Sequence, residues 1–190
     1  MVRDASKGEL MVLYAFGFER LGVMLSDLYF VNPAPTQGHE SPERGVRLEL
    51  RWLEAGQPQG SIYAARPITV AEPIWRADLL ESVDGPSGSF DRTHHHPRFD
   101  GWKVCRRVFD AELSADPLAW LDRQLSDLPN LLTRAGVDTD KVGRGDLTEL
   151  PRAVPEIVDV TRRMLDRVYA GELGRAPDGP PAEFVRASWL

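Results

Sequence analysis

Three consecutive histidines, His94–His96, form the part of this sequence best suited to chemistry. Imidazole titrates near neutral pH and is the most common metal ligand in proteins. Asp91 precedes the run and Arg98 follows it, and the whole chain contains only 4 histidines. This segment therefore concentrates the groups from which an acid–base site or a metal site could be built.

Neighbouring residues of an extended segment point to opposite faces, which predicts that His94 and His96 share one face and that His95 lies on the other. The shared-face pair could bind a divalent metal ion if a carboxylate joined it, and Asp78 and Asp91 are the candidates. The same pair could instead act as general acid and general base, with both aspartates orienting it. Candidate substrate-binding residues are Arg76, Arg98, Arg106 and Trp102.

Each of these candidate site residues could instead have a purely structural role. The histidine run could be a rigid loop, with one ring packed under Trp102 and the others hydrogen-bonded to backbone carbonyls. Arg76 and Asp78 lie two residues apart on one strand face, which favours a solvated surface pair. Cys105 is a potential nucleophile, but within an alternating strand we expect it to pack as a small hydrophobe. Tryptophans expected in the core or at its edge are Trp52, Trp75, Trp102 and Trp120.

The first half of the chain predicts strands that would position the cluster on a strand-to-strand connection. Residues 46–54 alternate apolar and charged side chains, the period of a half-buried strand. Residues 10–30 predict two strands around a turn at 20–22, with an N-terminal helix as the alternative for part of this segment. A loop is expected over 32–45. Further strands are predicted over 61–70, over 74–83 after Pro73, and over 102–110.

The second half predicts helices. The Asp116–Pro117 pair suits a helix start, because aspartate caps and proline fits the first helical position. Leucines recur at helical spacing up to Gly136, and Pro129 should kink or split this helix. A loop is expected over 137–150 and a second helix from Pro155. Strands first and helices after predict an α+β fold: a curved antiparallel sheet, open or partly closed into a barrel, with two C-terminal helices packed against it.

Length and composition predict one soluble domain. The chain has 190 residues, of which 42% are hydrophobic and 27% charged, enough for a single core. We expect one α+β domain over 1–174, strand-rich over 1–112 and helical over 113–174, and a flexible or docked tail over 175–190. The net charge of −6 argues against bulk nucleic-acid binding. One cysteine and no apolar run of membrane-span length favour a bacterial-type cytoplasmic protein.

These features predict a small hydrolase or ribonuclease-like enzyme that uses His94 and His96 on an anionic small molecule or RNA, with a divalent metal ion as the candidate cofactor. The absence of Walker, Rossmann and GxSxG motifs argues against nucleoside-triphosphate, dinucleotide and α/β-hydrolase chemistry. Two alternatives remain. The chain could be a non-catalytic antitoxin, immunity or accessory protein that docks a protein partner through its apolar tail, or a barrel that binds a small ligand.

Overall fold

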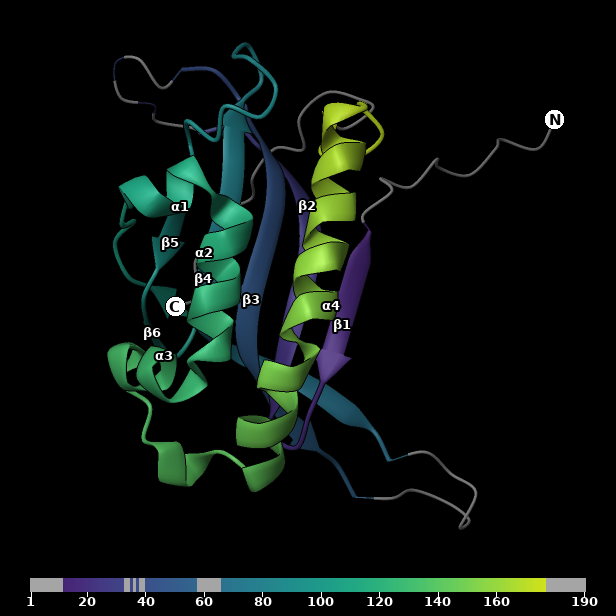
Figure 1. Ribbon diagram of the computed structural model, residues 1–190, viewed down its shortest axis with the longest axis vertical. Coiled ribbons are helices and arrows are strands. Elements are labelled where there is room, and N and C mark those ends of the chain that lie inside the picture. The colour runs from purple at the N-terminus through teal and green to yellow at the C-terminus, as the bar shows by residue number, and fades with distance from the viewer. Residues whose placement is uncertain (1–11, 33–34, 36, 38–39, 58–65, 177–190) are drawn as a thin grey trace, which may run out of the picture.

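The computed structural model describes residues 12–32, 35, 37, 40–57 and 66–176. Its main feature is a five-stranded antiparallel sheet of order β1-β2-β3-β4-β5, with helices packed on one face (Figure 1). The predicted α+β class is confirmed, and the sheet is open rather than closed into a barrel. The strands of this sheet are β1 (Leu13–Gly17), β2 (Leu21–Phe30), β3 (Glu43–Ala55), β4 (Ile68–Ser82) and β5 (His94–His96).

The remaining elements follow β5 along the chain. A small separate hairpin comes directly after it, and the helical layer begins a few residues later. These elements are β6 (Phe99–Asp100), β7 (Lys103–Val104), α1 (Ala111–Ala115), α2 (Pro117–Ser126), α3 (Leu128–Ala135), the 3-10 helix η1 (Thr139–Lys141) and α4 (Arg144–Tyr169).

Alternation along the central strands separates an apolar face from a charged face. Val23, Leu48 and Ala77 are fully buried on the helix side, where α4 crosses β2 and β3 and where α2 lies toward β4 (Figure 1). The positions of β3 and β4 that face the other side of the sheet, such as Arg47 and Arg76, carry the charges. The sheet is thus built to bury one face in the core and to leave polar side chains on the other.

The middle of the sheet differs from the prediction of two strands separated at Pro73. β4 runs as one strand from Ile68 to Ser82 and pairs with β3 along its length, while residues 61–65 of the predicted strand lie outside the described part of the chain. Pro73 pairs with Arg51 where the β3–β4 register shifts. A proline cannot donate to a β-ladder, and an irregularity of this kind lets it stay inside a strand.

Other element boundaries follow local sequence signals. The predicted strand pair near the N-terminus is confirmed as β1 and β2, and the helix alternative is wrong. β3 begins at Glu43, inside the predicted loop. Asp116 caps α2 by accepting from the Ala119 N–H, and the helix ends before Pro129 as predicted. Gly136 ends α3 with a φ of 74°, a conformation that favours glycine.

The predicted loop over 137–150 is wrong in its second half, because α4 begins at Arg144 and continues through Pro151 and Pro155. The fully buried Asp146 carboxylate accepts hydrogen bonds from the Gly143 N–H at 2.7 Å and from the Arg20 and Leu21 N–H groups, each at 3.0 Å. Asp146 thus combines a local cap at the Gly143 N–H with long-range hydrogen bonds to the β1–β2 turn, and these bonds offset the backbone hydrogen bonds that the prolines remove.

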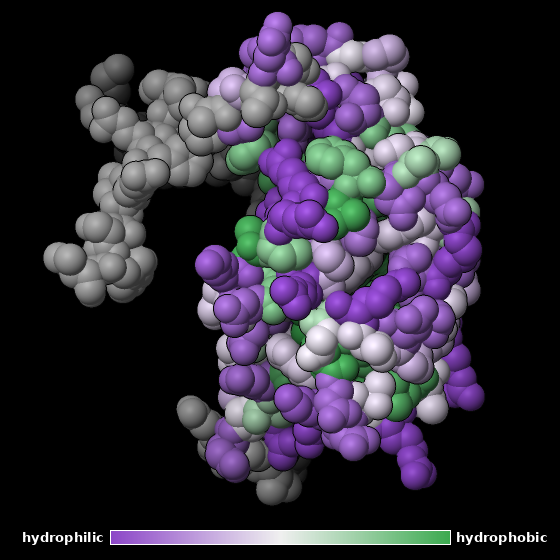
Figure 2. Space-filling view, turned by 90° about the vertical axis from the view of Figure 1, so that its left-hand side faces the viewer, coloured by the Kyte–Doolittle hydropathy of each residue, from purple (hydrophilic) through white to green (hydrophobic). Residues whose placement is uncertain are grey.

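Within the described ranges, no helix is both long enough and apolar enough to cross a bilayer. Figure 2 looks onto the side that carries α1, α2 and α3 in Figure 1, and it shows a mainly hydrophilic surface with small separate apolar patches. The predicted tail beyond residue 176 lies outside the described residues.

Replacing the buried anchor of α4 should strongly destabilise the fold. Asp146→Ala leaves three backbone N–H groups, two of them buried, without this acceptor, and we expect a loss of about 3 kcal/mol in the free energy of unfolding. Urea denaturation followed by circular dichroism measures this loss. Asp159→Ala is the matched control, because Asp159 lies on the same helix and pairs with the exposed Arg162 and Arg163. Equal stability of the two variants would contradict the anchoring role.

Candidate metal centre

The histidine run is itself a strand and not the predicted loop. β5 pairs with β4, so that His94 lies opposite Asp78 and His96 lies opposite Arg76. On its other side, His95 exchanges two backbone hydrogen bonds of 2.9 Å with Val108. The predicted strand over 102–110 is reduced to the two residues of β7 and this single bridge.

The predicted alternation of the three rings is confirmed. His94 and His96 lie on the sheet face away from the helices, with ring centroids 5.1 Å apart, and both are buried. His95 lies on the helix side, where its ring centroid is 5.1 Å from that of Trp120. One short strand therefore presents imidazoles to two separate environments.

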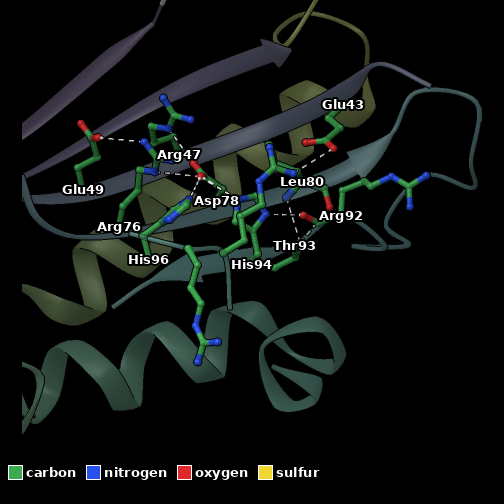
Figure 3. Close-up of polar contacts among 12 residues, drawn as sticks. Glu43, Arg47, Glu49, Arg76, Asp78, Leu80, Arg92, Thr93, His94 and His96 are labelled. Atoms are coloured by element: carbon green, nitrogen blue, oxygen red, sulfur yellow. Dashed lines mark hydrogen bonds and ion pairs between the residues drawn. The ribbon is translucent and has the colours of Figure 1, made fainter. Parts of the chain in front are cut away.

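The residues before β5 fix its position against β4. The Thr93 hydroxyl accepts from the Leu80 N–H at 3.0 Å and donates to the Leu80 carbonyl at 2.9 Å (Figure 3). The Asp91 carboxylate accepts from the backbone and hydroxyl of Ser82, both at 2.8 Å. Asp91, predicted as a site residue, thus holds the preceding turn and does not join the histidines.

Asp78 is the centre of the buried cluster, with a side chain only 1% exposed. Its Oδ1 accepts from Arg47 Nε at 2.7 Å, and its Oδ2 lies 3.0 Å from Arg76 Nε (Figure 3). The same Oδ2 lies 3.3 Å from His94 Nε2 and 3.7 Å from His96 Nε2. Burial alone would raise the pKa of Asp78, but His94, Arg47 and Arg76 outweigh burial and hold the pKa well below its usual value, so the group is a carboxylate.

Backbone carbonyls orient both imidazoles. His94 Nδ1 lies 2.8 Å from the Arg92 carbonyl, and His96 Nδ1 lies 2.8 Å from the Cys105 carbonyl. Because a carbonyl oxygen only accepts, each Nδ1 carries the proton, and in a neutral ring Nε2 is then an acceptor. Burial and the charge of Arg76 lower the pKa of His96 to about 4, so this ring is neutral at pH 7.

Three atoms that could hold a metal ion therefore lie together in one buried place. The two Nε2 atoms and a carboxylate oxygen of Asp78 lie within 4.8 Å of one another. His96 Nε2 is buried and has no hydrogen-bond partner among the described residues. Buried polar atoms are normally paired, and two histidines with one carboxylate are a known ligand set for divalent transition metals.

Residues 97–109, the cover loop, close over this cluster. Phe99 contacts the ring of His96 at a centroid distance of 6.3 Å, and Phe109 contacts the ring of His94 at 5.5 Å. The Arg76 guanidinium lies 5.7 Å from the Phe99 ring centroid. The cluster is consequently shielded from solvent by aromatic side chains of the segment that follows β5.

Several other predicted site residues lie away from the cluster. Arg98 and Arg106 are exposed on the cover loop. Trp102, expected near the core, is 68% exposed and stacks on the Arg51 guanidinium at 5.0 Å. Cys105 is half-buried outside any strand, and its carbonyl rather than its thiol contacts His96. The predicted solvated pair of Arg76 and Asp78 is wrong, because both side chains belong to the covered cluster.

Arg47 was not predicted as a site residue, although the alternation along its strand contained a signal for it. Arg47 alternates with buried Val46 and Leu48 in the strand that was predicted best. Its partner in the register is Asp78, so it faces the same side of the sheet as the cluster. The pairing of β3 with β4 would have been needed to find this contact.

Two hollows in the described surface lie elsewhere. One of about 620 Å³ is lined by Arg20, Trp52 and Lys141 among others, at the β1–β2 turn. One of about 210 Å³ lies on the helix side of β5, beside His95 and Trp120. Neither is lined by Asp78, His94 or His96, and these three side chains are buried, so a substrate would reach them only if the side chains that cover them moved.

Comparisons with known proteins yield no relative. Neither the protein-family models, nor the curated proteins, nor the solved structures contain a match to this chain. Functional inference for this protein therefore depends on the geometry of its own residues.

The neutral state of His96 should make the metal-free protein sensitive to acid. The unfolded chain protonates His96 near pH 6.5, whereas the folded protein does so only near pH 4. Between these values the unfolded state binds more protons, so stability is complete above about pH 6.5 and falls as the pH drops toward 4, by roughly 3 kcal/mol. Urea denaturation of chelator-treated protein at several pH values, beside His96→Gln, measures this effect. A variant that loses stability as steeply as the wild type would contradict it.

Proposed function

We propose that the protein binds one divalent transition metal ion through Asp78, His94 and His96 and uses this ion to hydrolyse an anionic ester. The observation that carries the proposal is the convergence of two Nε2 atoms and one carboxylate oxygen within 4.8 Å, all on buried residues. Acceptors placed together in a buried site repel one another unless a proton or a metal cation lies among them. A single divalent ion would satisfy all three.

The distances support such a site. Neighbouring ligands of a tetrahedral zinc ion with bonds of about 2.0–2.1 Å lie about 3.3 Å apart. The corresponding distances from Asp78 Oδ2 are 3.3 Å to His94 Nε2 and 3.7 Å to His96 Nε2. Small shifts of one ring would therefore complete the coordination. Three protein ligands leave a position for water or substrate, as in catalytic zinc sites.

The groups that hydrogen-bond to the three ligands also suit a metal centre. Histidines that bind a metal through one nitrogen usually donate the other N–H to a carbonyl or carboxylate, which fixes the ring. The carbonyls of Arg92 and Cys105 have this role here. Arg47 holds Oδ1 of Asp78 and leaves Oδ2 directed toward both imidazoles.

Arg76 opposes the ion, and this opposition is a testable part of the proposal. Its Nε lies 3.0 Å from Asp78 Oδ2 but makes no directed hydrogen bond. A like charge about 4 Å away costs about 4 kcal/mol per unit charge at an effective dielectric constant of about 20. Glu49 lies 4.0 Å from Arg76 Nη1, so the guanidinium can turn toward Glu49 when the ion enters.

Metal binding should depend on the two inward histidines and not on the third. We expect about one equivalent of zinc or cobalt per chain by isothermal titration and by elemental analysis, with loss of binding in His94→Ala/His96→Ala. His95→Ala is the matched control, since it lies on the same strand but faces the helices. Arg76→Gln should tighten binding by removing the opposing charge. Equal metal content in the double variant and in the wild type would refute the site.

We propose hydrolysis because the site would combine a metal-bound water molecule with nearby arginines that can bind an anion. A divalent ion acts as a Lewis acid and lowers the pKa of a water molecule that it binds. Arg98 and Arg106 are exposed on the cover loop and could hold an anionic substrate, with an RNA phosphodiester as the narrower possibility. Opening of the cover loop would bring these arginines and the cluster to one substrate. We place this activity in the cytoplasm, where a thiol such as Cys105 stays reduced.

The hydrolytic part of the proposal has a separate test. With zinc, manganese or cobalt added, the protein should hydrolyse bis(p-nitrophenyl) phosphate, and His94→Ala/His96→Ala should abolish turnover. Arg98→Ala/Arg106→Ala should raise KM about tenfold and leave kcat largely unchanged, because these side chains would bind the substrate and not the reacting water. Metal binding without turnover on any anionic ester would leave the metal site standing and refute hydrolysis.

A further inference from the structure

A second site lies on the opposite side of β5 and is independent of the Asp78 cluster. It is a pocket of about 210 Å³ between the edge of the sheet and the helical layer. Its walls include Trp75 from β4, His95 from β5 and Trp120 from α2. Asp110, Gln124 and Arg134 also line it, so apolar rings and polar groups meet in one small space.

The aromatic side chains form a rigid wall in which the rings of His95 and Trp120 are tilted by 54° to each other. Trp75 and Trp120 stack with centroids 5.9 Å apart and an interplanar angle of 19°, and each is only 3% exposed. The ring of His95 lies 5.1 Å from that of Trp120. Trp120 is also held by its Nε1–H, which donates to Asp110 Oδ2 at 3.1 Å. Such a wall suits a planar ring better than a flexible aliphatic chain.

The polar groups of the pocket differ in how many of their hydrogen bonds are made within the protein. Asp110 caps α1 by accepting from the Glu112 N–H at 2.8 Å, in addition to its bond with Trp120. His95 Nδ1 is buried and has no hydrogen-bond partner in the described part of the chain. The exposed Arg134 donates from Nη2 to Gln124 Oε1, which leaves other donors of its guanidinium for a ligand.

We propose that this pocket binds a small planar carboxylate, with its ring against Trp120 and His95 and its carboxylate on Arg134. The guanidinium fork matches a carboxylate in shape and charge. A volume of 210 Å³ equals that of roughly seven waters, each with a share of about 30 Å³, and so admits one ring with its substituent. The Asp110 charge repels a carboxylate, which directs the acidic end of the ligand toward Arg134.

Benzoate is the probe, and the readout is the indole Nε1–H signal of Trp120 in ¹⁵N-labelled full-length protein. We expect a saturable shift of this signal with millimolar benzoate and a much smaller response to benzamide or acetate, which lack the charge or the ring. The titration is done with a chelator present, so its outcome does not depend on the proposed metal site. A Trp120 signal that does not move with benzoate would overturn the proposal.

Arg134→Ala should weaken benzoate binding about tenfold or more, as expected for loss of a charge-assisted contact. Arg152→Ala is the matched control, because Arg152 is an exposed helix arginine remote from the pocket lining. Both side chains are exposed, so both variants should keep the wild-type melting temperature. Equal benzoate affinity in the two variants, or equal affinity of the wild type for benzamide, would refute recognition of the carboxylate by Arg134.

Discussion

The structure around the histidines depends on one buried carboxylate. Asp78 is almost fully removed from solvent and remains ionised because Arg47, Arg76 and His94 hold its pKa low, with the neutral His96 beside them. An ionised group in such a place is tolerated only when its partners are held in position. β3 supplies one partner, β4 another and β5 two more, so the register of three strands must agree for the cluster to exist. The charge pattern on this face is therefore a constraint on the whole sheet.

Local signals in the sequence predicted the fold class and the faces of the strands. The alternation in 46–54, the Asp116–Pro117 start and the split near Pro129 all depend on neighbours along the chain, and each is present in the structure. The start of α4 was not predictable in this way, because it depends on contacts between Asp146 and the β1–β2 turn. The continuity of β4 through Pro73 likewise depends on shifts in its register with β3, which local sequence does not reveal.

The site was predictable only where it depends on local sequence. The shared face of His94 and His96 follows from the period of a strand, and Asp78 was among the carboxylates considered. The choice between Asp78 and Asp91 was not open to local reasoning, because it is decided by the pairing of β4 with β5. The structural alternative for the run was also correct in one respect: two of the rings do bond to backbone carbonyls. The same bonds that hold the rings leave their Nε2 atoms directed at Asp78.

The three-residue length of β5 has a consequence for how this chain can vary. Because side chains alternate along a strand, a slip of β5 by one residue against β4 would place His95 beside the carboxylate and would turn His94 and His96 toward the tryptophans. Such a slip would leave one imidazole in place of two beside Asp78, and three identical side chains do little by themselves to disfavour it. The turn before β5, held by Asp91 and Thr93, must therefore define the register of β5 against β4. An insertion or deletion of one residue between Asp91 and His94 would be more damaging than many substitutions within the histidine run, because it would change the spacing from these anchors to the histidines.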